Sequence, residues 1–511
     1  MLDLVLLVIA ILVSLLFAYI FTHLPWWISR QKRFSRKKTS WIAYWMIVVV
    51  FLLAFASSNN GFSTSLLHRS KSPGNDPPAY SLSSFHAILK NVNWSGYHND
   101  NIHSGYVANE PDPHELIRSW ATALGNAVYA EPLVVGEHLI IASEGDNIYS
   151  LDVRTGKIQW RTNIGRPVPL STLGCSGTID LLGITGTPVY DPVSGLVFAV
   201  AEVSGPRHVL VGIDPNTGDV RVRRSVDVPE MKPPGIYLQR PALALSHGMV
   251  YIAFGGLADD CGQYHGTLVA SRTDGQEPLL SYQVPTHDSG GIWGTSGPVI
   301  DQNGRIYVTT GNEDHMTQYW DWDLSNALLR LSPTLQLEDS FAPANWRMQD
   351  TGNQDLGSMG PALLPGGYVF AAGKSGDGYL LNANALGGIG GQVATMKICN
   401  GLAMGGVATI GSQIIVPCSD GLRSIQVEAG PKLKINWHAL PQIALPPVVG
   451  GNTVYSLDQE GTLYALDLAT GKVRTQLALG ITVPHFVTPT IAAGRLFVGT
   501  TLGIVSVALE T

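Results

Sequence analysis

The sequence predicts an all-β propeller of eight blades, with seven blades as the alternative, preceded by two transmembrane helices. A hairpin with the turn Asp-x-x-Thr-Gly recurs along the chain. Short strands that open on proline recur at intervals of roughly 40 to 60 residues, a period typical of propeller blades with four strands each. Two apolar segments before residue 57 predict the membrane helices.

The composition of the chain agrees with many short strands joined by turns. Its 511 residues include 56 Gly and 31 Pro, and only 14% are charged. The net charge is -7, and because the first 90 residues hold 9 basic and 2 acidic side chains, the remainder is strongly acidic. An acidic body does not match a phosphate backbone, which calls for clustered Lys and Arg. Nucleic acid is therefore excluded as a partner.

The N-terminal part is predicted to be a two-pass membrane anchor. Residues 1–24 and 41–56 are apolar enough for two spans, and the loop 25–40 between them carries six Lys and Arg side chains. By the positive-inside rule this loop stays in the cytoplasm. Residues 57–91 are rich in Ser and Pro and form a linker, so that residues 92–511 form an extracytoplasmic propeller attached to the cell membrane.

A cleaved signal peptide is the alternative interpretation of the first apolar segment. Such a peptide needs a basic start. The chain begins Met1-Leu2-Asp3-Leu4, which is not basic. We therefore expect the segment to remain as a span.

Three hairpins carry the repeat in its clearest form. They are NIYSLDVRTGKIQW (147–160), LVGIDPNTGDVRVR (210–223) and TLYALDLATGKVRT (462–475). In each, an alternating strand is followed by Asp, a turn closed by Thr-Gly and a second strand. The glycine supplies positive φ and the Asp can hydrogen-bond the turn backbone.

Seven of the eight predicted blades begin with a strand whose first residue is proline, a position at which the missing N–H donor does no harm. One blade begins instead at Gly405-Gly406-Val407. The last unit has room for three strands only, and LIRSWATAL (116–124) is expected to supply its fourth, which closes the ring. The prolines that open the other seven are Pro132, Pro188, Pro241, Pro298, Pro361, Pro447 and Pro489.

This repeat resembles that of the pyrroloquinoline-quinone (PQQ)-like propellers, over about residues 92–511. The family includes quinoprotein dehydrogenases and non-enzymatic propellers such as the outer-membrane assembly lipoprotein BamB. For an enzyme, the resemblance implies PQQ and Ca²⁺ as cofactors, an alcohol or sugar as substrate, and a membrane quinone or separate carrier as electron acceptor. For a scaffold, it implies an envelope protein or polymer as partner.

Five residues fall where the resemblance places the quinone site. Trp293, in GGIWGTSG, is similar to the aromatic floor under the cofactor, and Asn312 and Glu202 are similar to Ca²⁺ ligands. Asp355, in QDLGSMG, is similar to the general base beside the metal, and Lys374, in AAGKSGDG, to the cation at the quinone oxygens. Taken singly, each also fits a structural role in a turn or blade interface.

The sequence departs from the alcohol dehydrogenases of this class. They carry two adjacent Cys above the cofactor, whereas the four Cys here are isolated from one another. No Cys-x-x-Cys-His motif is present, so a covalently attached haem is not expected. An even number of Cys in an oxidising compartment predicts the disulfides Cys175–Cys261 and Cys399–Cys418.

Histidines are scattered along the chain rather than grouped in a recognisable motif. We expect each of them at the surface or at a pocket rim. They are His86, His98, His103, His114, His265, His287 and His315.

Two spans with a cytoplasmic basic loop place both termini outside the cytoplasm. We predict that a reporter fused after Thr511 is active when it requires export and inactive when it requires the cytoplasm. A C-terminal fusion that works only in the cytoplasm would contradict this topology.

Overall fold

A computed structural model describes residues 93–257, 261–313 and 321–511. The expected spans 1–24 and 41–56, the basic loop 25–40 and the linker 57–91 all lie outside these residues. Within the described ranges, no helix has the length and apolar character needed to cross a bilayer.

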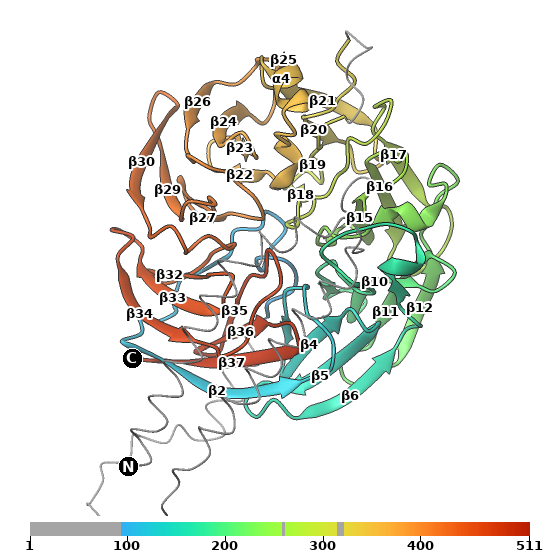
Figure 1. Cartoon of the computed structure of the whole chain (residues 1–511), viewed down its shortest axis with the longest axis vertical. Helices are drawn as coiled ribbons and strands as arrows, with labels where there is room; N and C mark the ends of the chain where they lie inside the picture. The colour runs from blue at the N-terminus through green and yellow to red at the C-terminus, as the bar shows by residue number, and fades with distance from the viewer. Residues whose placement is uncertain (1–92, 258–260, 314–320) are drawn as a thin grey trace, which may run out of the picture. The chain divides into compact units, whose positions relative to one another are not determined.

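The described residues form eight sheets arranged as a ring, each built on four antiparallel blade strands of which the first lies nearest the centre (Figure 1). Three of these sheets gain a short fifth strand. The eight-bladed prediction is confirmed over the seven-bladed alternative. Blade 1 consists of β3 (Leu133–Val135), β4 (His138–Ser143), β5 (Asn147–Asp152) and β6 (Ile158–Asn163), and blade 2 of β9 (Val189–Asp191), β10 (Leu196–Val203), β11 (Arg207–Ile213) and β12 (Val220–Ser225). Blade 3 consists of β14 (Ala244–Ser246), β15 (Met249–Gly256), β16 (Thr267–Arg272) and β17 (Leu280–Gln283), and blade 4 of β18 (Val299–Ile300), β19 (Ile306–Thr309), β20 (Leu328–Leu331) and β21 (Leu337–Ala342).

Blades 5 to 8 continue the same order, except that the outer strand of the last blade comes from the start of the described chain. Blade 5 consists of β22 (Ala362–Leu364), β23 (Tyr368–Ala372), β24 (Asp377–Asn382) and β26 (Ala394–Lys397), and blade 6 of β27 (Ala408–Ile410), β28 (Gln413–Val416), β29 (Arg423–Glu428) and β30 (Lys432–His438). Blade 7 consists of β31 (Val448–Gly450), β32 (Thr453–Leu457), β33 (Thr462–Asp467) and β34 (Val473–Ala478), and blade 8 of β35 (Thr490–Ala492), β36 (Arg495–Gly499), β37 (Gly503–Glu510) and β2 (Glu115–Ala123).

Short elements decorate the ring. They are β1 (Tyr106–Val107), β7 (Val168–Pro169), β8 (Leu181–Leu182), β13 (Tyr237–Leu238), β25 (Gly388–Ile389), the 3-10 turns η1 (Leu170–Thr172), η2 (Pro234–Ile236) and η3 (Leu356–Ser358), and the helix α4 (Trp346–Thr351).

Ring closure follows the sequence prediction. The strand β2 pairs antiparallel with β37, from Glu115 opposite Glu510 to Ala123 opposite Gly503. Figure 1 shows the blue N-terminal strand lying along the red C-terminal one. Because both ends of the described chain share one sheet, the ring has no open edge between blades 8 and 1.

The Thr-Gly turns of the repeat also form contacts between blades. Gly156, Gly218 and Gly471 have φ values of 68°, 78° and 68°. A Cβ on Gly156 would lie 2.4 Å from Cε3 of Trp120, which is on the outer strand of the preceding blade. Gly218 faces Trp160 and Gly471 faces Trp437 in the same way. The glycine is therefore needed both for its backbone conformation and for the space that the indole occupies.

Hydrogen bonds fix the same contact. The indole Nε1 of Trp160 donates to the carbonyl of Pro215 at 2.9 Å, and that of Trp437 donates to Leu468 at 2.8 Å. Between blades 2 and 3, Val222 stands in the place of the tryptophan. A Cβ added to Gly275 would lie 2.9 Å from Cγ1 of Val222. The repeat therefore keeps its geometry where its aromatic residue is replaced.

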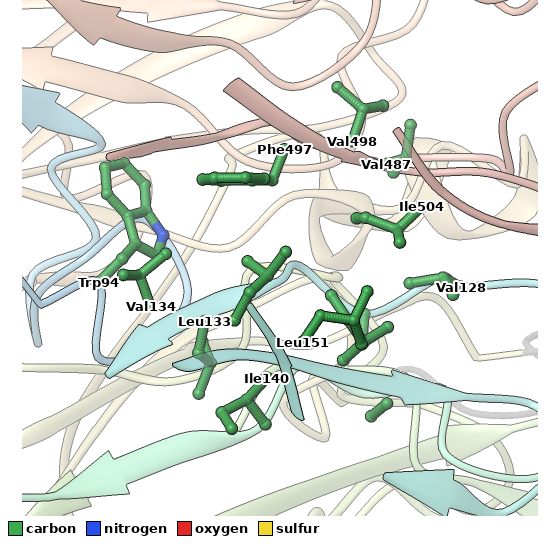
Figure 2. Close-up of a cluster of buried hydrophobic side chains, with 14 of the residues drawn as sticks. Trp94, Val128, Leu133, Val134, Ile140, Leu151, Val487, Phe497, Val498 and Ile504 are labelled. Atoms are coloured by element: carbon green, nitrogen blue, oxygen red, sulfur yellow. The ribbon is translucent and has the colours of Figure 1, made fainter. Parts of the chain in front are cut away.

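The largest apolar cluster of the described residues extends over blades 7, 8, 1 and 2 and includes the junction of blades 8 and 1. Figure 2 shows Leu133, Ile140 and Leu151 of blade 1 facing Phe497, Val498 and Ile504 of blade 8. Leu133, Leu151 and Phe497 are fully buried. Burial of this apolar surface stabilises the junction at which the ring closes.

Residues 94–107 cross the inner strands of the ring. Their backbone groups hydrogen-bond to Val134, Tyr190, Ile300, Thr409 and Val449, one residue on the first strand of each of five blades.

The expectation of surface or rim positions is wrong for His98 and His103. Both are buried, because the crossing segment carries them inside the ring. Nδ1 of His98 lies 2.9 Å from the carbonyl oxygen of Val407, and Nε2 lies 3.0 Å from Oγ1 of Thr488. Burial lowers the pKa of each to about 3, so both are neutral.

Both predicted disulfides are confirmed. Cys175–Cys261 joins the connection before blade 2 to an insertion in blade 3, and Cys399–Cys418 joins the end of blade 5 to blade 6. Between Cys399 and Cys418, the strands β27 and β28 form a hairpin that turns at Gly411-Ser412. Each bond therefore links neighbouring blades.

The Trp–Gly contact can be separated from the positive-φ requirement by two matched substitutions. Gly471 (φ 68°) contacts Trp437, whereas Gly430 (φ 80°) has no atom near its absent Cβ. Gly430→Ala should cost only the backbone strain, about 1–3 kcal/mol. Gly471→Ala should lose about 1–3 kcal/mol more through the clash. Denaturant unfolding measures both, and equal losses would contradict the packing role.

Candidate functional site

One end of the ring gathers all the residues of the candidate site. In an antiparallel four-stranded blade, the loop between the second and third strands and the connection to the next blade lie at the same end. Asn312 and Lys374 lie in loops of the first kind, after β19 and β23. Trp293 and Asp355 lie in connections of the second kind, before β18 and β22. The topology therefore brings residues from separate blades together.

Asp355 is at the centre of this group. Its carboxylate is 3% exposed and forms an ion pair with Lys374. Its Oδ1 accepts a hydrogen bond from the backbone N–H of Asn312 at 2.7 Å. Its own carbonyl accepts a bond from the backbone N–H of Lys374 at 2.9 Å. Two neighbouring blades thus hold the carboxylate in place.

Glycines permit these close approaches. A Cβ on Gly311 would lie 3.1 Å from both Asp355 Oδ1 and the indole Nε1 of Trp293. A Cβ on Gly373 would lie 2.2 Å from the carbonyl oxygen of Asp355. The Gly-rich sequence around these residues is therefore required by the packing of the site.

Lys374 connects the carboxylate to the aromatic ring. Its Nζ lies 5.3 Å from the ring centroid of Trp293, within the range of a cation–π contact. The same ammonium donates to Oδ1 of Asn353 at 3.0 Å. With a side chain that is 20% exposed, Lys374 can reach a ligand in the adjacent space.

That space is a cavity of about 340 Å³. Trp293, Asn312, Asp355 and Lys374 all line it, so four of the five residues expected at a quinone site share one cavity. Apolar side chains from the segments joined by Cys175–Cys261 cover another part of its wall. They include Leu170, Ile179, Leu182 and Leu257.

Arg240 also lines the cavity, and sequence reasoning missed it. It is 8% exposed, its Nη2 donates to the carbonyl of His485 at 3.0 Å, and its guanidinium lies 5.4 Å from the Tyr129 ring centroid. The only local signal is an Arg directly before Pro241, at the start of an inner strand. The cavity therefore offers two cations, an aromatic face and apolar walls.

Glu202, the fifth expected residue, does not line this cavity. It lies on β10, directly opposite His208 on β11, and its Oε2 is 3.7 Å from Nε2 of His208. Nδ1 of His208 lies 2.7 Å from Asp227. Burial alone would lower the pKa of His208, but bonds to Asp227 and Glu202 raise it to about 9. Glu202 is thus the partner of a buried imidazolium.

Two further acidic side chains are buried near Glu202. Burial, and to a smaller extent the charges of Glu144 and Glu202, raise the pKa of Asp146 to about 8. Burial raises the pKa of Glu144 to about 7, although bonds from Gly183 and Thr185 oppose the shift. Neither carboxyl oxygen of Asp146 has a hydrogen-bond partner.

The sequence profile of a family described as outer membrane protein assembly factor BamB matches residues 118–232 and 426–510. These matched residues contain the three Asp-x-x-Thr-Gly hairpins. The chain is therefore similar to the PQQ-like β-propeller repeat family in these hairpins. No curated protein sequence matches it significantly.

Solved structures of this PQQ-like propeller type share its architecture at low sequence identity. A quinohemoprotein alcohol dehydrogenase from Comamonas testosteroni is 15% identical with a TM-score of 0.62, covering 83% of each chain. A europium-containing methanol dehydrogenase is 15% identical with a TM-score of 0.60, covering 84% of this chain and 100% of its own. BamB from Moraxella catarrhalis is 17% identical with a TM-score of 0.52, covering 77% and 99%. At these identities the likeness establishes the fold.

The buried Asp146 makes stability depend on pH. Its folded pKa of about 8 lies above the ordinary value near ~4, so the folded state favours the protonated carboxyl. Its contribution is complete at low pH and is lost as pH rises toward 8. Asp146→Asn suits the positive φ of 54° and removes the charge. We expect this variant to match wild type at pH 5 and to exceed it by roughly 1–3 kcal/mol at pH 8.5.

Chemical denaturation at the two pH values measures this effect, with the exposed Asp219→Asn as control. A stability difference between wild type and Asp146→Asn that does not change with pH would show that Asp146 does not titrate in this range.

Proposed function

We propose that the cavity binds a planar, anionic quinone of the PQQ class and that the chain acts as an alcohol or sugar dehydrogenase. The observation that carries this proposal is the meeting of Trp293, Asp355 and Lys374, from three separate segments, at one cavity. Its volume of about 340 Å³ is at the lower end of the range for small-molecule sites, ~300–1,000 Å³.

The donor set fits a flat polycarboxylate. The indole of Trp293 would lie against the ring system, and Lys374 and Arg240 would pair with carboxylate or quinone oxygens. The apolar walls would exclude water from the rings. Such a cofactor, when bound, accepts the two electrons released by an alcohol.

Asp355 is the candidate general base. A carboxylate held by Lys374 and by the N–H of Asn312 is fixed in position, and a small hydroxyl substrate beside it could transfer its proton to the free lone pairs. Lys374 would balance the negative charge around the base and the cofactor. The other residues of the site would hold these groups in position, and none of them would need to carry a proton.

The residues fit Ca²⁺ less well than they fit the quinone. Ca²⁺ takes 6–8 oxygen ligands. Among the residues that the structure describes, the cavity-lining ones with carboxylate or amide oxygens are Asp355, Asn312 and Asn353, while Glu202 lies elsewhere and Lys374 already faces Asp355. In the proposed site the ammonium of Lys374 would supply part of the positive charge that a metal ion would supply. Any Ca²⁺ would draw most of its ligands from the cofactor and water.

A binding propeller in the cell envelope is the second candidate. The match to the BamB family profile favours it, since that match covers the hairpins and none of the cavity residues in blades 4 and 5. In that case the loops of the ring would hold a protein or polymer. Binding of PQQ by the cavity separates the two candidates.

We further propose that the propeller is extracytoplasmic and anchored to the cell membrane by the two N-terminal spans. The two disulfides support an oxidising compartment, because such bonds are rare where thiols are kept reduced.

Substitution of Asp355 tests the enzyme proposal. Asp355→Asn keeps the shape and removes the basicity. We expect PQQ to quench tryptophan fluorescence in both proteins, with affinity changed only modestly, while oxidation of alcohols or sugars with an artificial acceptor falls by ~10²-fold or more. Trp293→Leu should instead weaken PQQ binding. If wild type neither binds PQQ, with or without Ca²⁺, nor reduces the acceptor, the envelope-binding candidate stands.

A further inference from the structure

A second group of metal-ligating side chains lies next to the cavity but belongs to other residues. His287 is in the connection between β17 and β18, and Glu313 and Asp323 are in the loop between β19 and β20. One potential ligand atom from each residue lies within 4.8 Å of the other two. Glu313 directly follows Asn312, which lines the cavity.

The distances match those between ligands of a tetrahedral ion. Nδ1 of His287 lies 3.2 Å from Oε1 of Glu313 and 3.5 Å from Oδ2 of Asp323. Ligands at about 2.0–2.2 Å from a tetrahedral Zn²⁺ are separated from one another by about 3.3–3.6 Å. An ion could therefore enter with little movement of these side chains.

Glu313 supplies an independent observation. Its side chain is 1% exposed, and neither of its carboxylate oxygens has a hydrogen-bond partner among the residues that the structure describes, although its Oε1 lies 3.2 Å from Nδ1 of His287. Buried carboxylates are normally hydrogen-bonded, paired or bound to a metal, because an unsatisfied one is costly. Its Oε1 faces His287. The side chain is thus oriented toward His287 as a metal ligand would be.

Outer hydrogen bonds hold the ligands in this arrangement. Oδ1 of Asp323 accepts from the N–H of Ser325 at 3.2 Å, whereas Oδ2 faces His287 and has no hydrogen-bond partner within the described part of the chain. The backbone N–H of Glu313 donates to Oδ1 of Asp350 at 3.2 Å, and Asn326 donates to the same oxygen at 2.7 Å. Such second-layer bonds orient the ligands of metal sites in proteins.

We propose that His287, Glu313 and Asp323 bind a divalent transition-metal ion of the Zn²⁺ class at the rim of the cavity. One imidazole and two carboxylates suit Zn²⁺, Mn²⁺ or Co²⁺, whereas Ca²⁺ requires more oxygens. The His287 side chain is 43% exposed, so solvent can supply the fourth ligand. The ion would tie the connection before blade 4 to the loop of blade 4 that carries Asn312.

The competing explanation is a protonated His287 that forms ion pairs with both carboxylates and binds no metal. Full-length, untagged protein is stripped with a chelator and titrated with Zn²⁺ by calorimetry, without PQQ. Co²⁺ is added in parallel, because a four-coordinate Co²⁺ ion gives intense visible absorption bands. The variants are Glu313→Gln, Asp323→Asn and His287→Ala, with the exposed Asp321→Asn as the matched control.

We expect wild type and Asp321→Asn to bind one equivalent of Zn²⁺ and to show the Co²⁺ bands. Each ligand variant should lose at least ~10-fold in affinity. His287→Ala changes a half-exposed residue and provides the test should a variant at the buried Glu313 not fold. Absence of stoichiometric Zn²⁺ binding by wild type, or equal binding by the ligand variants, overturns the proposal. Neither result depends on whether the cavity binds a quinone.

Discussion

Contact between an outer-strand side chain of one blade and the turn glycine of the next sets the geometry of the ring. Where Trp120, Trp160 or Trp437 packs on its glycine, no larger residue could occupy the turn. The contact fixes the distance and rotation between neighbouring blades, and the inner strands converge as a result. The loops that carry Asn312 and Lys374 belong to blades 4 and 5 and lie at the end of the ring opposite to these turns.

Much of the fold could be predicted because its signals are local. Prolines open the inner strands, and Asp with Thr-Gly closes the hairpins, so the units can be counted from sequence. Closure by residues 116–124 follows from the missing strand of the last unit. The crossing of the inner strands by residues 94–107 has no such signal, because its hydrogen bonds join backbone groups of distant residues. For this reason His98 and His103 were expected at the surface or at a rim.

The candidate site was predicted in part for a similar reason. Trp293, Asn312, Asp355 and Lys374 lie in Gly-rich segments whose loops meet at one cavity. Glu202 lies in a segment of the same kind, but its hairpin places His208 directly opposite, and the buried imidazolium binds it. Arg240 was not predicted as a site residue, because its contact with the cavity depends on its burial in the assembled ring.

Closure by β2 and β37 determines the order in which the protein can mature. The strand β2 stays unpaired until its partner β37 has been made. Blades 1 to 7 can form in sequence as the chain emerges, whereas the eighth forms only once β37 is available. If the chain is exported as proposed, the ring is sealed only after β37 has crossed the membrane, and a product truncated before β37 would be left with an exposed β2 edge open to proteolysis and aggregation.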